Sequence, residues 1–190
     1  MNSSVKKLMA LVALSAATTS FCTSAAEEEW RANMDKARTL LQQGKPIDAE
    51  MTLRTTLTTV QKLKHDQMYG RYMGLLGGSL FTQNKNKEMI PFAEDALKTF
   101  YALPANQWPP PSVFFNNHSD LAISYQMQGK LKQAELQYYK AIAIADKMKP
   151  GERDRPWLKT CFDNLLYCLH AEKKADEEKK AREQLKKMLG

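Results

Sequence analysis

Apolar and small residues recur along this chain with the period of a helix. In the stretch "YQMQGKLKQAELQYYKAI", Ala134, Tyr138 and Ala141 follow one another at intervals of four and three residues. Such intervals place side chains on one face of an α-helix. Gly129 interrupts the run just before, and a residue that tolerates a left-handed backbone favours a tight turn there. The stretch therefore predicts two helices, joined at Gly129, that pack closely against each other.

The same pattern recurs around Gly44, Asn84 and Lys173, which with Gly129 are separated by 40, 45 and 44 positions. Before each of these residues, apolar residues recur one turn apart. After the first three, small and apolar residues stand at offsets of five, nine and twelve: Ala49, Leu53 and Thr56; Met89, Ala93 and Ala96; Ala134, Tyr138 and Ala141. One helical hairpin cannot bury its apolar face alone, so the units must stack.

The repeats predict an all-α fold, an α-solenoid of about four helix–turn–helix units over residues 28–64, 67–103, 112–149 and 154–189. The fourth unit departs from the pattern, because Glu178 and Arg182 stand where the others carry apolar residues. A last helix that no repeat covers requires a polar face, and acids and bases one turn apart can pair. We expect "AEKKADEEKKAREQLKK" to form a polar C-terminal capping helix.

The third unit, "DLAISYQMQGKLKQAELQYYKAI", resembles the tetratricopeptide repeat (TPR). It has a Leu followed by a small residue, a Tyr one turn later, then Ala, an aromatic residue and a final Ala. The spacing exceeds the usual ~34 residues and is similar to that of the kinesin-light-chain type, as is "DNLLYC" beside "SDLAISY". The resemblance covers nearly all of residues 28–190. It implies a concave surface, lined by the first helix of each unit, that holds a peptide or a partner helix.

The first 26 residues read as a cleavable secretory signal peptide. Lys6 and Lys7 precede an apolar run from Leu8 to Ala17, and small residues end at Ala26. The run is shorter than the ~20 residues of a spanning helix. An uncleaved anchor and a lipoprotein modified at Cys22 are the alternatives. Cleavage lowers the net charge from +7 to +5 and leaves a repeat domain over residues 27–190. We expect no membrane span after cleavage, and export to a bacterial periplasm or secretion.

Cys161 and Cys168 are the cysteines that remain after cleavage. On one helix, seven residues separate their Cα atoms by ~10 Å, and a disulfide needs ~7 Å or less. We expect two buried free thiols, with a metal pair or an intermolecular bridge as alternatives.

Candidate chemistry is sparse. The histidines lie in three different units, none has the i, i+4 partner of a helical zinc site, and the chain has no phosphate loop or nucleophile elbow. Lysines alternate with acids, which argues against sequence-specific nucleic-acid binding. We therefore expect no enzyme activity, metal or cofactor.

A proline-rich segment, "NQWPPPS" over residues 106–112, separates the second and third units. Three prolines favour a stiff, extended chain. We expect a rigid spacer covered by Trp108, with Ser112 capping the next helix. A ligand for a proline-recognition domain is the alternative.

The TPR resemblance assigns concave-groove positions to residues of each unit. These are Arg31, Met34, Arg38 and Leu41; Gly74, Gly78 and Phe81; Asn116, Ser119, Ile123 and Gln126; and Asp163, Asn164, Tyr167 and His170. The arginines at one end suit a peptide whose acidic or C-terminal end lies near the first unit. The Lys and Asn clamp of chaperone-binding TPRs is not reproduced, because Met34 and Arg38 stand at the comparable places.

Gly74 and Gly78 stand one turn apart inside a helical pattern, where each glycine costs ~1 kcal/mol relative to alanine. We hypothesise a bare backbone floor, walled by Phe81, on which a partner lies. Easier packing against the third unit, or no role at all, is the alternative.

The sequence thus predicts an exported TPR scaffold, expected to be monomeric, that binds an unidentified protein or peptide through its concave groove. The alternative is a structural or assembly subunit of an envelope complex that docks by an edge or by its convex face.

Overall fold

The structure, a computed structural model, describes residue 25 and residues 27–62 and 66–189, and they are helical apart from turns and short connections. The all-α prediction is confirmed for this part of the chain. Except for residue 25, the predicted signal peptide with Cys22 lies outside the described residues. Within them, no helix combines the length and the apolar character that crossing a membrane requires.

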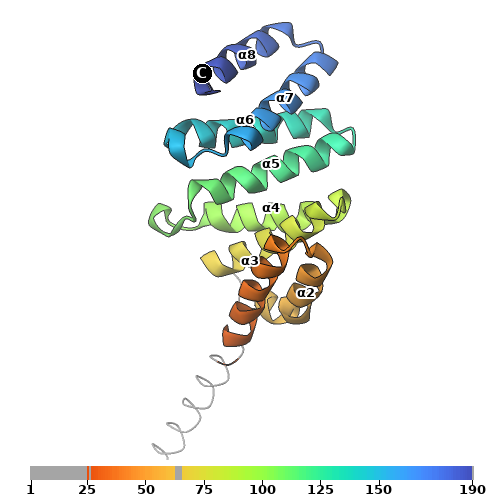
Figure 1. The fold of residues 1–190 in the computed structure, drawn as a ribbon, viewed down its shortest axis with the longest axis vertical. Coiled ribbons are helices and arrows are strands. Elements are labelled where there is room, and N and C mark those ends of the chain that lie inside the picture. Colours follow the sequence, from red (N-terminus) through yellow and green to blue (C-terminus); the bar gives the residue numbers. More distant parts are fainter. Residues whose placement is uncertain (1–24, 26, 63–65, 190) are drawn as a thin grey trace, which may run out of the picture. The chain divides into compact units, whose positions relative to one another are not determined.

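The chain divides into two compact units, residues 1–63 and 64–190. In the first, a helix over residues 27–42 forms a hairpin with α2 (Pro46–Lys62), drawn in orange in Figure 1. The buried residues of these helices include Trp30, Ala37, Ala49 and Leu53. The Asn33 amide joins the two helices by donating to the Thr55 hydroxyl at 3.1 Å.

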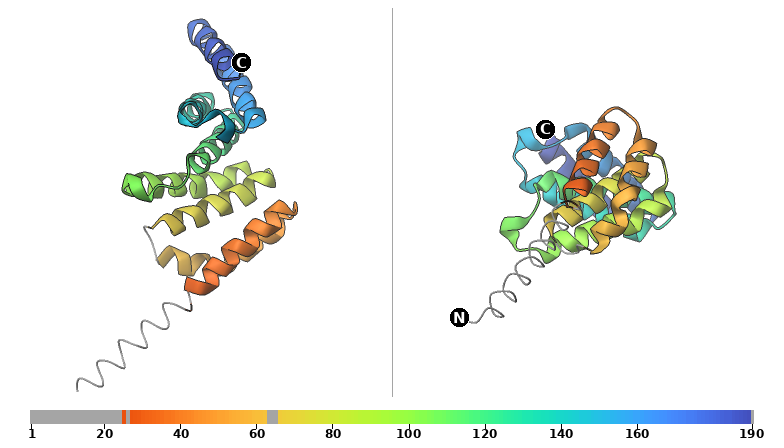
Figure 2. Two further views of the ribbon diagram at one scale, coloured as in Figure 1. Left: turned by 60° about the vertical axis from the view of Figure 1, so that its left-hand side comes forward. Right: turned by 90° about the horizontal axis from the view of Figure 1, so that it is seen from below.

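The second unit consists of three further hairpins. Their helices are α3 (Gln67–Thr82), α4 (Asn86–Ala102), α5 (Pro111–Met127), α6 (Leu131–Lys147), α7 (Arg155–Ala171) and α8 (Ala175–Leu189). Each helix packs on the next, and the first helices of the hairpins also touch, α3 with α5 and α5 with α7. Figure 2 shows this stacking of helix pairs from two further directions. The predicted arrangement of stacked helix–turn–helix units is confirmed.

The same turn joins the two helices of every hairpin. The backbone is left-handed at Gly44 and Gly129, with φ of 70°, at Asn84, with φ of 59°, and at Lys173, with φ of 58°. In each turn the next residue donates its N–H to a carbonyl five positions earlier, at 2.9–3.0 Å. This is the Schellman motif, which satisfies carbonyls at a helix end. The four turn positions that the repeat pattern predicts are therefore confirmed, including Lys173, where the side chain makes positive φ unfavourable.

Small side chains lie where the two helices of a hairpin approach each other. Ala49, Ala93 and Ala134 are buried, and a Cβ atom on Gly77 would stand 3.4 Å from the Ala93 nitrogen. In α8 the buried residues are instead Ala181 and Met188. The predicted polar character of the last helix is confirmed: an ion pair of 2.6 Å joins Glu178 to Arg182 on its surface.

The connection from α4 to α5 differs from the prediction in one respect. Ser112 does not cap α5: the helix begins at Pro111, and its N-cap is Pro110, which makes no side-chain hydrogen bond. Proline suits the first helical position because its missing N–H would have no partner there. A short 3₁₀ turn, Ala105–Gln107, precedes the prolines. Trp108 packs on its neighbours and donates its indole N–H to the Leu103 carbonyl at 2.9 Å.

Cys161 and Cys168 lie in the single helix α7, and both are free and buried. The prediction of two buried free thiols is confirmed, because one continuous helix keeps the two residues too far apart to bridge.

Candidate functional site

In the first hairpin, two of the residues predicted to line the groove, Arg31 and Arg38, are exposed to solvent. Each pairs within its own helix, Arg31 with Glu27 at 2.5 Å and Arg38 with Asp35 at 2.7 Å. Exposed pairs of this kind contribute ~1 kcal/mol or less, so a partner's carboxylate can replace the intrahelical acid. Met34 is only 2% exposed. Its assignment to the groove surface is wrong, because the side chain is buried.

On α3 the two glycines differ. A Cβ atom on Gly78 would meet nothing within 4 Å, whereas one on Gly74 would stand 3.2 Å from the Asn117 amide oxygen. Gly78 therefore borders open space, one turn before the half-buried Phe81. Gly74 packs against α5. The two glycines do not form one continuous floor, and the open backbone is limited to Gly78.

On α5, Asn116 is exposed, while Ile123 and Gln126 are half-buried. The Gln126 amide oxygen accepts a hydrogen bond from the Tyr138 hydroxyl at 2.6 Å, which fixes the side chain against α6. Ser119 is 0% exposed. It donates its hydroxyl to the Phe115 carbonyl at 2.7 Å and accepts from the Cys161 thiol at 3.2 Å. Ser119 therefore ties α5 to α7, and its assignment to the groove surface is wrong.

On α7, Asn164 is half-buried and Tyr167 is 59% exposed. Asp163 pairs with Lys159 at 2.6 Å, and His170 approaches Glu178 of α8 at 3.4 Å. Together with Gly78, Phe81, Ile123 and Gln126, the residues Asn164 and Tyr167 form what we call the first-helix surface of residues 64–190.

The described side chains near this surface hold no activated nucleophile. Burial raises the pKa of the Cys161 and Cys168 thiols to about 11 each, so both are protonated at neutral pH. Burial likewise raises the pKa of the Asp120 carboxyl to about 7. Within residues 27–62 and 66–189, no three His, Cys, Asp or Glu side chains gather to form a metal site. The chemistry that these residues offer is recognition by apolar, amide and hydroxyl groups.

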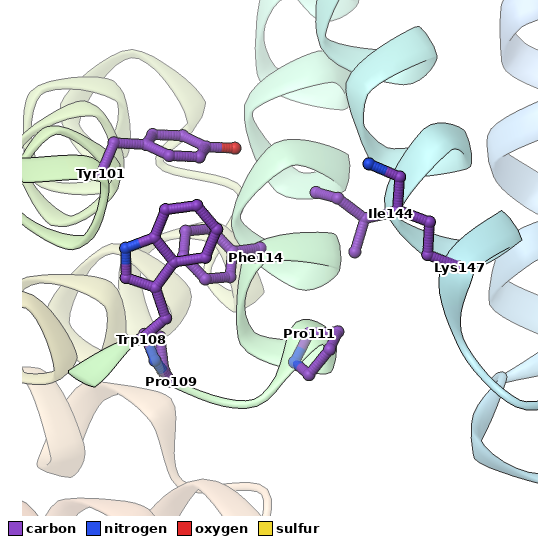
Figure 3. Close-up of a pocket in the computed structure, with 7 residues that line it drawn as sticks. All are labelled: Tyr101, Trp108, Pro109, Pro111, Phe114, Ile144 and Lys147. Carbon is purple, nitrogen blue, oxygen red and sulfur yellow. The ribbon is translucent and has the colours of Figure 1, made fainter. Parts of the chain in front are cut away.

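A pocket that the repeat pattern does not predict shares no lining residue with the first-helix surface. It has a volume of about 310 Å³ and is formed by the end of α4, the α4–α5 connection, the start of α5 and the end of α6. Figure 3 shows its lining: Tyr101, Trp108, Pro109, Pro111, Phe114, Ile144 and Lys147. We call this the aromatic pocket. Two of its rings are half-exposed, Tyr101 at 48% and Trp108 at 43%.

A buried histidine holds one wall of the aromatic pocket. His118 contacts the Tyr101 hydroxyl through Nε2 at 2.8 Å and the Gln137 amide oxygen through Nδ1 at 2.7 Å. Burial is the main cause that lowers the pKa of His118 to about 4, so the ring is neutral at pH 7. The Gln137 oxygen can only accept. Nδ1 therefore carries the proton, and Nε2 accepts a hydrogen bond from the Tyr101 hydroxyl. This hydrogen bond fixes the position of the Tyr101 ring.

One sequence signal points to the aromatic pocket. Tyr101, Trp108 and Phe114 lie within fourteen positions, on both sides of the proline run. Aromatic residues next to a stiff segment are candidates for a preformed apolar site, whereas Ile144 and Lys147 are distant in sequence and become lining residues only through the fold.

No family model and no curated protein matches the chain. Solved structures do match. BtubC (BKLC) from P. vanneervenii has a TM-score of 0.69 at 16% identity, covering 86% of this chain and 64% of that one. The TPR domain of Arabidopsis FLU has a TM-score of 0.55 at 22% identity over 65% of this chain and 99% of that one. The nearly identical TPR-like repeats of a putative kinesin light chain from Podosopora anserina score 0.51 at 14% identity, over 83% and 93%.

The fold of this chain is thus the TPR-type fold of stacked helical hairpins. Stacked repeats of this type present extended surfaces.

Proposed function

We propose that this chain is an exported adaptor that binds a peptide or protein segment through the first-helix surface. The observation that carries the proposal is the exposure of Tyr167 at 59% on α7, on the same set of first helices as the open backbone at Gly78. Large aromatic side chains are enriched where partners bind, because they supply much contact area at a small entropic cost. The amides of Gln126 and Asn164 supply polar contacts to the backbone of an extended peptide.

Capture from envelope extract tests this function. The purified protein and its Tyr167→Ala variant are immobilised, and the retained proteins are compared by mass spectrometry. Leu136→Ala is a matched control, because Leu136 is 54% exposed but lies on the second helix α6. We expect a set of partners that Tyr167→Ala loses and Leu136→Ala retains. Two results contradict binding by the first-helix surface: partners that only Leu136→Ala loses, and partners that both variants retain.

Export is a separate part of the proposal, and it rests on the charged, apolar and small-residue segments of residues 1–26. Expression with a C-terminal tag, followed by fractionation and intact-mass measurement, tests it. We expect a periplasmic or secreted species that begins at residue 27. A species that retains all 190 residues contradicts cleavage, and a mass increased by acyl chains at Cys22 identifies a lipoprotein instead.

The second candidate function is an assembly subunit that docks by a face other than the first-helix surface. The aromatic pocket favours it, because most of its lining comes from the second helices α4 and α6 and from the connection before α5, with only Pro111 and Phe114 supplied by the start of α5. An assembly subunit is expected to oligomerise or to need its partner for solubility, which analytical ultracentrifugation of the purified protein measures. An adaptor of the first kind is expected to sediment as a monomer.

A further inference from the structure

The aromatic pocket is preformed. Trp108 meets Tyr101 edge-on at an interplanar angle of 89° and a centroid distance of 5.9 Å, and it meets Phe114 at 61° and 5.5 Å. Edge-to-face pairs of this geometry are attractive. Hydrogen bonds fix both outer rings, Tyr101 through His118 and Trp108 through the Leu103 carbonyl. A ligand therefore has little ordering to impose on the walls, which lowers the entropic cost of binding.

The lining of the pocket carries a positive charge. Lys147 is the one charged residue among the lining residues, and it forms no ion pair with another described residue. Figure 3 shows Lys147 beside Ile144 on α6, across the gap from the aromatic rings. Lys140, two turns earlier on α6, is close enough to His118 to disfavour its protonation.

The start of α5 adds to this potential. Pro111 lines the pocket and is the first residue of α5, which has neither a side-chain cap nor an acid in its first turn. The N-terminus of a helix carries a partial positive charge. A ligand that combines an apolar group with a nearby carboxylate complements both the rings and Lys147.

The openness of the walls indicates a macromolecular ligand. Sites for small molecules bury most of the ligand surface, but Tyr101 and Trp108 remain 48% and 43% exposed. A volume of about 310 Å³ accommodates one large side chain and leaves the atoms on either side of it outside. This geometry suits an anchor residue of a polypeptide.

We propose that the aromatic pocket is a second docking site, which takes one large apolar side chain of an acidic peptide segment while a neighbouring carboxylate of that segment pairs with Lys147. This site is independent of the first-helix surface, and its test does not depend on that proposed function.

Fluorescence anisotropy with three labelled peptides tests the proposal. The first contains Glu-Phe-Glu between glycines, the second Gln-Phe-Gln and the third Glu-Ala-Glu. We expect the purified protein to bind the first peptide in the micromolar to millimolar range, the second about two- to fivefold more weakly, as an exposed ion pair allows, and the third not measurably. Added salt is expected to weaken binding of the first peptide and to leave the second unchanged.

Three variants assign the binding to residues. Lys147→Gln is expected to bind Glu-Phe-Glu only as tightly as Gln-Phe-Gln. Its affinity for Gln-Phe-Gln should equal that of the parent protein. Lys98→Gln is the matched control, since this exposed lysine lies on α4 and does not line the pocket. Trp108→Ala is expected to weaken binding of both phenylalanine peptides about tenfold or more. Tyr167→Ala is expected to leave the affinity for both peptides unchanged. Circular dichroism verifies that each variant is folded.

Four outcomes of the peptide titrations overturn the proposal. They are absence of Glu-Phe-Glu binding, equal affinity for Glu-Phe-Glu and Gln-Phe-Gln, indifference to Lys147→Gln, and loss of binding with Tyr167→Ala, which moves the ligand to the first-helix surface. Self-association of the purified protein that Trp108→Ala abolishes also overturns it, because the pocket then holds a second copy of the chain.

Discussion

Replacing Gly78 by alanine should stabilise the protein. Gly78 lies in the interior of α3, where glycine costs ~1 kcal/mol relative to alanine because it loses more backbone entropy on folding. The added methyl group would meet nothing within 4 Å, so no steric cost offsets the gain. We expect stabilisation by about 0.4–1 kcal/mol, which corresponds to a rise in melting temperature of about 1–6 °C for a domain the size of residues 64–190.

Other glycines supply controls of opposite sign. A Cβ atom on Gly70, also in α3, would stand 2.4 Å from the Phe100 ring, which is fully buried and packs edge-on against Phe114 at 5.5 Å. Because the ring cannot move freely, Gly70→Ala is expected to cost about 1–3 kcal/mol by overpacking. Gly129→Ala places a side chain at φ of 70° and is expected to cost about 1–2 kcal/mol.

Urea titration followed by circular dichroism at 222 nm measures these changes as shifts of the midpoint at constant slope. A midpoint that falls for Gly78→Ala shows that the space beside this residue is filled, and refutes the open backbone on which the first-helix surface depends. A midpoint that stays unchanged for Gly70→Ala refutes the packing of α3 on α4 described above.

Three further predictions follow from buried groups. Ala134→Leu overpacks a side chain with 0% exposure and should cost ~1–3 kcal/mol; an unchanged melting temperature contradicts the helix contact there. Cys161 and Cys168, with pKa values of about 11, should react with a thiol reagent only as the protein unfolds, and rapid labelling of native protein contradicts their burial. His118 has a folded pKa of about 4 against 6.5 ordinarily, so the unfolded chain binds its proton first, and stability should fall by up to about 3 kcal/mol as pH falls from 6.5 to 4. Asp120, whose folded pKa is raised to about 7, changes stability in the opposite direction over this pH range. The measurement is therefore the difference between the parent protein and His118→Gln in how the free energy of unfolding depends on pH. Identical slopes of this free energy against pH contradict the prediction.

The sequence predicts the hairpins well because their signal is local. Gly44, Asn84 and Gly129 stand at fixed distances along the sequence from the small residues that follow them. Each turn residue and its small residues belong to the same hairpin, so the pattern needs no information from other units. Lys173 has no turn propensity of its own, and its left-handed backbone was predictable only from the register of the other copies.

The candidate site is less predictable because its exposure depends on neighbouring units. Ser119 has the same periodic position as the exposed Asp163 of the fourth hairpin, but α5 is a middle helix that contacts α3, α4, α6 and α7. It buries polar as well as apolar side chains, among them His118 and Ser124. The aromatic pocket joins Tyr101 to Lys147, and no periodicity within one helix connects residues so far apart.

The local character of the helix packing has a kinetic consequence. Among the helices of residues 66–189, the most extensive contacts join α3 to α4 and α5 to α6, and each of these pairs is closed by a single tight turn. Chains dominated by contacts that are close in sequence fold quickly, because little loop entropy is lost before contacts form. The α5–α6 hairpin also touches both α4 and α7, so it can serve as a nucleus from which folding of residues 66–189 propagates in both directions.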